Sequence, residues 1–139
     1  MTTPAPLDNF GPPAEPSLSM GVIGNCAFSA LIDKRARIVW CCMPRFDSPP
    51  VFHALLHSAA GGAGEVPEPA CEGSMGVELE GCVRTEQHYD DGTAILRTRL
   101  VDGSGNAIEV CDFAPRFRHH ERMFRPAQLV RRLRPLSGH

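Results

Sequence analysis

Hydrophobic and polar residues alternate over several short segments of the chain, and this pattern is typical of β-strands. In residues 93–101, Leu96 and Leu100 would lie on one face, with Arg97 and Arg99 on the other. An antiparallel partner with one solvated face would place Glu109 within reach of these arginines. The same reasoning, with the turn residues between segments, predicts strands over residues 27–33, 37–43, 76–80, 82–89, 93–101, 107–113 and 128–136.

One short helix is expected after a polar corner. The apolar segment 38–43 stops at Pro44, and the sequence Arg45-Phe46-Asp47 follows, with no glycine to loosen the corner. After Pro49 and Pro50, apolar residues recur at a helical spacing, which predicts a helix of about two turns within residues 51–57.

The turn at residues 33–36 joins two of the predicted strands. It reads Asp-Lys-Arg-Ala and contains no glycine, whereas two-residue hairpin loops favour Asn-Gly or Asp-Gly. We therefore expect a longer loop or a β-bulge at this turn.

The fold class predicted from these elements is mainly β, an antiparallel β-sandwich with one short helix after the Pro-Arg-Phe-Asp corner. The last predicted strand is followed only by Ser-Gly-His, so we expect an incomplete sandwich with an open edge, truncated at its C-terminal end. Residues 1–19 are rich in proline and small residues and should form a disordered arm, leaving residues 20–139 as the sandwich domain.

Charge is unevenly distributed along the chain. Residues 116–134 contain seven arginines and one glutamate, a local charge of +6, whereas residues 1–115 contain 7 basic and 15 acidic residues, a charge of −8. Apolar residues interrupt the arginines, and nucleic-acid sites favour lysines with aromatics on a broad basic face. We expect no nucleic-acid binding, and instead a strand that meets an acidic partner surface.

Other features limit the cell compartment and the cofactors. No apolar run approaches the ~20 residues needed to cross a bilayer, and the N-terminal segment lacks the basic and apolar regions of a signal peptide. We expect a cytoplasmic protein without membrane contact. The six cysteines form no C-x-x-C pair and read mostly as small buried residues, so no metal or other cofactor is expected.

Three residues are candidates for a site. Arg45 and Asp47 could touch a substrate, or could pair with each other and fix a domain interface, which we favour. Trp40 is the single tryptophan and could form a sugar platform, although its apolar neighbours favour the core. No residue is predicted to be catalytic, because the local acidic pairs Glu78/Glu80 and Asp90/Asp91 fall in a strand and a turn.

Several motifs carry a resemblance to a known family. The sequence resembles the N-terminal domain of bacterial glycoside hydrolase family 15, the glucoamylase and trehalase-like enzymes. In order and spacing, the matching motifs are Ile23-Gly24-Asn25, Ser29-Ala30-Leu31-Ile32, Ile38-x-Trp40, Pro44-Arg45-Phe46-Asp47-Ser48-Pro49, Val51-Phe52 and Asp112-Phe113-Ala114-Pro115-Arg116. One departure is Asn25, which stands where many members have aspartate.

This resemblance implies a β-sandwich that packs against and supports an α/α barrel, where two glutamates hydrolyse α-glucosidic bonds. The barrel is absent from this chain, so we expect it to be inactive alone, with trehalose or an α-glucan bound only at the barrel mouth. The resemblance does not choose between these substrates. A different interpretation is a stand-alone carbohydrate-binding module using Trp40, Arg45 and Asp47. The open edge further predicts self-association.

Overall fold

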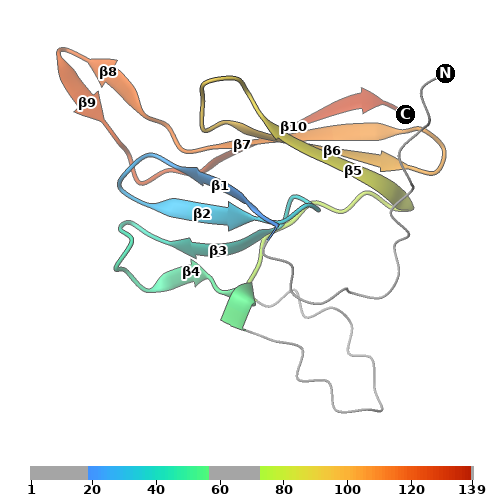
Figure 1. Ribbon diagram of the computed structural model, residues 1–139, viewed down its shortest axis with the longest axis horizontal. Helices are drawn as coiled ribbons and strands as arrows, with labels where there is room; N and C mark the ends of the chain where they lie inside the picture. The colour runs from blue at the N-terminus through green and yellow to red at the C-terminus, as the bar shows by residue number, and fades with distance from the viewer. Residues whose placement is uncertain (1–18, 57–72, 139) are drawn as a thin grey trace.

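The computed structural model describes residues 19–56 and 73–138, which form two antiparallel sheets and one projecting hairpin (Figure 1). The mainly β fold predicted from the sequence is confirmed. The predicted arm lies outside the described residues, except for Ser19.

Sheet A is a four-stranded meander in which each strand pairs with the next along the chain. Its strands are β1 (Gly21–Gly24), β2 (Ser29–Ile32), β3 (Ile38–Cys42) and β4 (Pro50–Phe52). Side chains alternate across it, so that Ile23, Ala30 and Cys41 face the interior and are fully buried.

Sheet B contains the longer strands, in the spatial order β10-β7-β6-β5. These strands are β5 (Cys82–Tyr89), β6 (Leu96–Asp102), β7 (Ala107–Phe113) and β10 (Val130–Ser137). Among the described strands β10 pairs with β7 alone, so the predicted open edge is present. Arg97 and Glu109 form the expected cross-strand ion pair, with Nη1 2.9 Å from Oε1.

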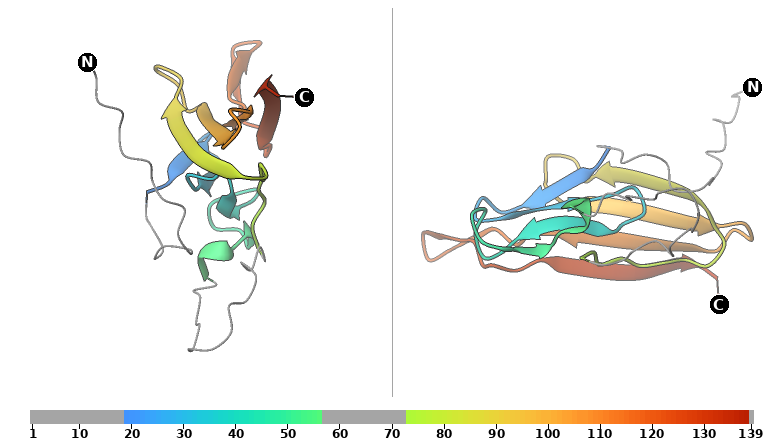
Figure 2. Two further views of the ribbon diagram at one scale, coloured as in Figure 1. Left: turned by 90° about the vertical axis from the view of Figure 1, so that its right-hand side faces the viewer. Right: turned by 90° about the horizontal axis from the view of Figure 1, so that it is seen from below.

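The core lies between the two sheets. β1 is the strand of sheet A that lies against β6 and β7, and seen from below sheet A stands in front of sheet B (Figure 2). The core cluster of buried residues comprises Ile23, Phe28, Ala30, Ile32, Ile38, Cys41, Leu96 and Ala114. Sheet A supplies most of these side chains, because its short strands are apolar on their inner face.

Tyr89, the last residue of β5, closes the sandwich along β1. Its hydroxyl donates to the carbonyl of Val22 at 2.9 Å and accepts from the amide of Val22 at 2.6 Å. β1 is an edge strand, and its backbone groups would otherwise meet only water at this point. One side chain therefore links the edges of both sheets.

The prediction of a two-turn helix within residues 51–57 is wrong at its start, and residue 57 lies outside the described residues. Residues 50–52 form β4, because Phe52 and Pro50 pair with Cys41 and Cys42 of β3. Only a single 3-10 turn follows, η1 (Ala54–Leu56). Two prolines suggested a helix start, but the edge of β3 offered backbone partners that a helix would have left unpaired.

The strand predicted over residues 76–80 is also absent. Met75 forms an isolated bridge with Ile38, and the next residues run without a strand partner until β5 begins. The expected irregularity is present next to the turn at residues 33–36, as a bulge in the pairing of β2 with β3 between Leu31 and Ile32. Ala36 takes a positive φ of 60° there, the role that glycine usually fills.

The sequence analysis did not predict the hairpin at residues 117–124. β8 (Phe117–His119) and β9 (Arg122–Phe124) follow β7 and precede β10 in the sequence. They pair with each other and project beyond both sheets at one end of the molecule (Figure 1). The turn residues His120 and Glu121 of this hairpin have φ values of 46° and 60°. This is the left-handed geometry of two-residue hairpin turns, here without glycine or asparagine.

Candidate functional site

The corner between β3 and β4 is held by its own hydrogen bonds. Arg45 donates two parallel hydrogen bonds to Asp47, from Nε to Oδ1 at 2.9 Å and from Nη2 to Oδ2 at 3.2 Å. The amide of Arg45 donates to the Ser48 hydroxyl, and the amide of Ser48 donates back to the Arg45 carbonyl. The pairing expected between these two charged residues is therefore present.

This ion pair faces solvent. The side chains of Arg45 and Asp47 are 74% and 72% exposed, and Phe46 between them is 58% exposed. An exposed pair contributes only about 0.2–1 kcal/mol to folding. The corner presents a fixed charge pair and an aromatic ring to whatever binds there.

Beside the corner lies an open depression of about 650 Å³, formed by three segments distant in sequence. They are the β1–β2 turn, the corner, and the end of the β8–β9 hairpin. The residues lining the depression are Cys26, Ala27, Arg45, Phe46, Asp47, Met123 and Arg125. Thus Arg45 and Asp47 lie in one site, together with Met123 and Arg125, which the sequence analysis did not select.

Asn25 fixes the geometry of this site. Its side-chain amide donates to the carbonyl of Pro115 at 3.0 Å and to that of Pro126 at 2.8 Å, while its oxygen accepts from the amide of Ala27 at 3.1 Å. Pro115 precedes the hairpin and Pro126 follows it. The buried Asn25 therefore ties both ends of the hairpin to the β1–β2 turn.

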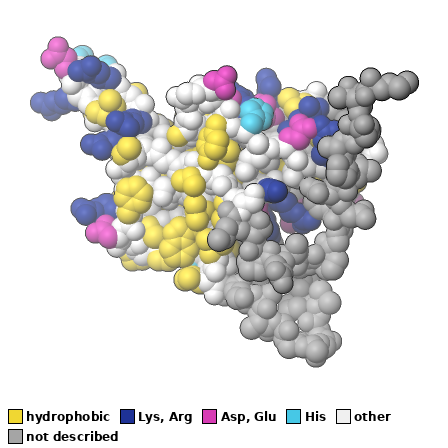
Figure 3. Space-filling model, viewed as in Figure 1, with side chains coloured by type: hydrophobic (Ala, Val, Ile, Leu, Met, Phe, Trp, Pro, Cys, Tyr) yellow, Lys and Arg dark blue, Asp and Glu magenta, His cyan; other side chains and the backbone are white. Residues whose placement is uncertain are grey.

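Trp40 occupies a different surface. It is half-buried and lies across from Leu31, which in turn lies across from Val22, so the three form a row over the outer face of sheet A. The expectation that Trp40 belongs to the core is wrong, because the alternation of β3 turns Cys41 inward and Trp40 outward. Hydrophobic side chains gather over β1–β4 in the space-filling view (Figure 3).

The described residues offer little hydrolytic chemistry. Asp90 forms two hydrogen bonds with Arg97, at 2.5 and 2.8 Å, and these bonds hold the pKa of its carboxyl below the usual value. Burial raises the pKa of the Cys41 and Cys111 thiols, which keeps them protonated at neutral pH. The part of the chain that the structure describes contains no group of three potential metal ligands.

The basic C-terminal stretch is divided between interior and surface. Arg131 points inward and forms two hydrogen bonds with the fully buried Asp112, at 2.6 and 2.9 Å, and Arg134 pairs with Glu109 at 3.2 Å. Arg118 and Arg122 form no ion pair with any described residue and are exposed on the hairpin. Two arginines of this stretch are therefore neutralised by carboxylates of β7, which lowers its net positive charge.

Sheet A and the corner both lie within a segment of the chain that matches a known protein family. The sequence model described as "Trehalase-like, N-terminal" matches residues 9–134. This chain belongs to that family. The trehalase-like match includes both the corner and the hairpin that form the depression.

Two curated relatives of this trehalase-like domain are trehalases. The trehalase of Mycolicibacterium smegmatis is 32% identical over 101 residues, which cover 70% of this chain and 15% of that protein. Trehalase 1 of Sulfolobus acidocaldarius is 55% identical over 42 residues, covering 30% of this chain and 7% of that protein. The chain thus spans a small fraction of the length of either relative. No solved structure matches it.

No helix among the described residues is long and apolar enough to cross a membrane.

Proposed function

We propose that this trehalase-like domain is the non-catalytic N-terminal domain of a glycoside hydrolase family 15 enzyme, of the glucoamylase and trehalase-like kind, which acts in the cytoplasm. It would pack against and support an α/α barrel that hydrolyses α-glucosidic bonds. The observation that carries the proposal is the family match, which occupies nearly the whole chain and leaves the remaining length of the trehalase relatives outside it.

The site geometry supports a non-catalytic role. Inverting glycosidases place two carboxyl groups ~6.5–9.5 Å apart across a sugar and a water. The depression beside the corner contains one carboxylate, that of Asp47, and this group already accepts both hydrogen bonds from Arg45. Both oxygens of this carboxylate are engaged by Arg45, and no second carboxylate lines the depression to complete a catalytic pair.

Glucose release tests the proposal directly. The purified chain should release no glucose from trehalose or from maltose, whereas the same assay with the trehalase of Mycolicibacterium smegmatis provides the positive control. Activity that survives repurification and is lost in Asp47→Asn would contradict the proposal, because it would place catalysis within this chain.

A stand-alone carbohydrate-binding module is the second candidate, since the exposed Arg45–Asp47 pair beside Phe46 offers both hydrogen bonds and a ring face to a sugar. Titration with malto-oligosaccharides, followed by calorimetry, separates the two functions. A supporting domain should show no saturable heat, and a binding module should show heat that Arg45→Ala abolishes.

A further inference from the structure

The β8–β9 hairpin has two different faces. Phe117 lies opposite Phe124, and the rings stack with centroids 5.6 Å apart and planes inclined by 12°. Arg118 lies opposite Met123, and the alternation of the strands places this pair on the other face. Met123 also lines the depression, so the face of Arg118 and Met123 continues the surface of the corner.

This hairpin is unusual in being exposed along its whole length. Each of its six strand residues is exposed, and Phe117, Met123 and Phe124 are 50%, 47% and 41% accessible. A two-stranded hairpin is at best marginally stable by itself in water. Met123 and Phe46 are half-exposed apolar residues that both line the depression, and together they form a surface that a partner can complete.

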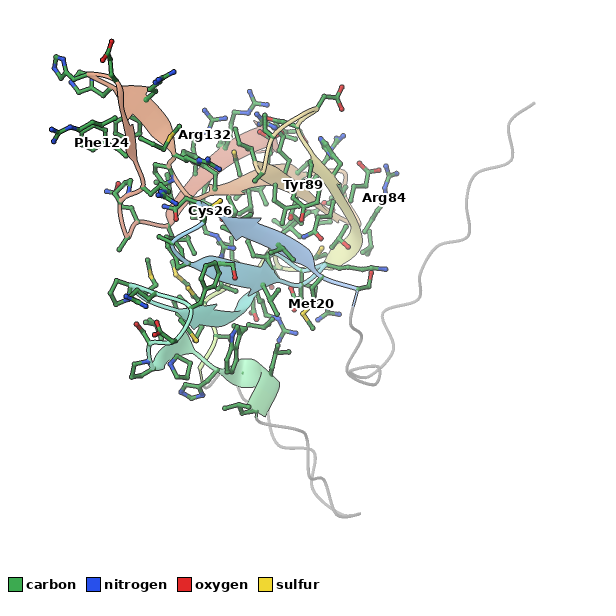
Figure 4. All side chains as sticks on the ribbon, turned by 60° about the vertical axis from the view of Figure 1, so that its left-hand side comes forward. Met20, Cys26, Arg84, Tyr89, Phe124 and Arg132 are labelled. Atoms are coloured by element: carbon green, nitrogen blue, oxygen red, sulfur yellow. The ribbon has the colours of Figure 1, made fainter. Side chains whose placement is uncertain are left out.

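The base of the hairpin is nevertheless fixed. Asn25 holds both of its ends, and Arg116 donates to the sulfur of Cys26 at 3.2 Å. Figure 4 shows Phe124 on the projecting arm and Cys26 at the β1–β2 turn near its base. A fixed base spares part of the entropy that ordering a free loop would cost on binding.

The depression has the character of an anchor pocket. Phe46, Met123 and Ala27 supply apolar lining, whereas Arg125 supplies a positive charge at its margin. Arg45 is already neutralised by Asp47, whereas Arg118 and Arg125 form no ion pair among the described residues. An apolar pocket with unpaired guanidinium groups matches an apolar side chain flanked by carboxylates.

We propose that this surface, defined by Phe46, Arg118, Met123, Arg125 and the Arg45–Asp47 pair, docks on an acidic protein surface that inserts an apolar side chain into the depression. The occupant is the larger part that the trehalase relatives carry beyond the aligned segment, so the inference rests on the proposed function. The stacked face, with Phe117 and Phe124, stabilises the arm and points away from the partner.

A protein partner fits better than a nucleic acid. Single-stranded nucleic acids bind aromatic rings whose faces are free for base stacking. Phe117 and Phe124 occupy each other's faces, and Glu121 adds a negative charge at the tip of the arm. The depression instead offers a concave, partly apolar surface in which an apolar side chain of a protein can be buried.

A chimera tests the proposal. The full sequence of this chain would replace the aligned segment of the Mycolicibacterium smegmatis trehalase. Calorimetry would then follow the thermal unfolding of the chimera. Arg118→Glu should lower the unfolding midpoint of the chimera, whereas Arg122→Glu, the same charge change on the opposite face, should leave it unchanged. In the isolated chain neither substitution should shift the midpoint, because both side chains are exposed.

Hydrogen exchange gives a second readout that needs no variant. Amides of residues 117–124 should exchange about tenfold or more slowly in the chimera than in the isolated chain, because docking suppresses local opening of the arm. Equal effects of Arg118→Glu and Arg122→Glu, or unchanged exchange, would overturn the assigned surface.

Failure of the proposed function looks different. If the unsubstituted chimera unfolds in two independent transitions, one at the temperature of the isolated chain, the domains do not pack, and both proposals fall. Binding of a single-stranded RNA probe of about 20 nucleotides to the isolated chain, lost in Arg118→Glu, would overturn the protein partner in favour of nucleic acid.

Discussion

Arg131 and Asp112 form a bidentate ion pair inside the protein, with Nε 2.6 Å and Nη2 2.9 Å from the two carboxylate oxygens. The two residues lie directly opposite each other on β10 and β7. Their side chains are 5% and 0% exposed, so neither charge can be solvated by bulk water if its partner is removed. The pair fixes the register of β10 on sheet B.

Removing one residue of the Arg131–Asp112 pair should strongly destabilise the fold. Asp112→Ala should lower the free energy of unfolding by about 3–5 kcal/mol, because it leaves a buried guanidinium without its counter-charge. Urea denaturation measures the change. Arg132→Ala, at the exposed neighbouring position of β10, is the matched control and should cost less than about 0.5 kcal/mol. A small effect of Asp112→Ala would mean that water reaches Arg131.

Asn25→Asp should loosen the base of the hairpin. An ionised aspartate cannot donate to the carbonyls of Pro115 and Pro126, and leaving these partly buried carbonyls unpaired costs about 1 kcal/mol or more each. We expect a lower melting temperature and faster amide exchange in residues 117–124. Asn25→Ala should cost less, since it removes the donors without placing a charge against the carbonyls; the reverse order would contradict this account.

Tyr89→Phe should release the β1 edge. The substitution removes only the hydroxyl, which exchanges two hydrogen bonds with Val22. Because Tyr89 is 42% exposed, water can replace part of this interaction, and the expected loss is about 1 kcal/mol. Exchange of the Val22 amide should accelerate while amides in the centre of β6 stay protected. Uniform acceleration would indicate global destabilisation instead.

Asp90 should make stability depend on pH at the acidic end. Its hydrogen bonds to Arg97 lower its folded-state pKa, so the carboxylate contributes stability above the usual pKa near 3.9 and loses it as the pH falls through the lower folded value. Asp90→Asn should therefore be less stable than the native chain at pH 6, with the gap closing toward pH 2. A constant gap would exclude this titration.

Self-association should increase with salt. β10 is an open edge with Leu133 and Leu136 exposed, and Arg132 repels a second copy at low ionic strength. Screening over the ~8–10 Å Debye length removes this repulsion. Light scattering after size-exclusion chromatography should show larger species at high salt, and Leu133→Lys should suppress them. A monomer at every salt concentration would contradict the prediction.

Local patterns predicted much of the fold. Residues 82–89 and 107–113 form strands with the predicted bounds, because their alternation and flanking turns are clear. β4 was missed because its prolines resemble a helix start, and pairing with β3 decided the outcome. The β8–β9 hairpin was missed because its turn adopts positive φ values with histidine and glutamate.

Only the residues of the candidate site that are close together in the sequence could be predicted. Opposite charges two residues apart gave the Arg45–Asp47 pair, which needs no distant contact. Met123 and Arg125 reach the same depression through tertiary packing, and the inward turn of Arg131 depends on Asp112 of another strand. Alternation in 128–136 assigned Arg131 a face but could not show that this face held a buried carboxylate.

Asn25 also sets the order in which the chain can fold. Its two carbonyl partners lie 90 and 101 residues further along the sequence, so the hydrogen bonds of the β1–β2 turn stay incomplete until Pro115 and Pro126 have joined the fold. Closing loops of this length is entropically costly and slows folding. During synthesis, β1 and β2 must therefore wait for residues about a hundred positions downstream before the turn between them is fully hydrogen-bonded.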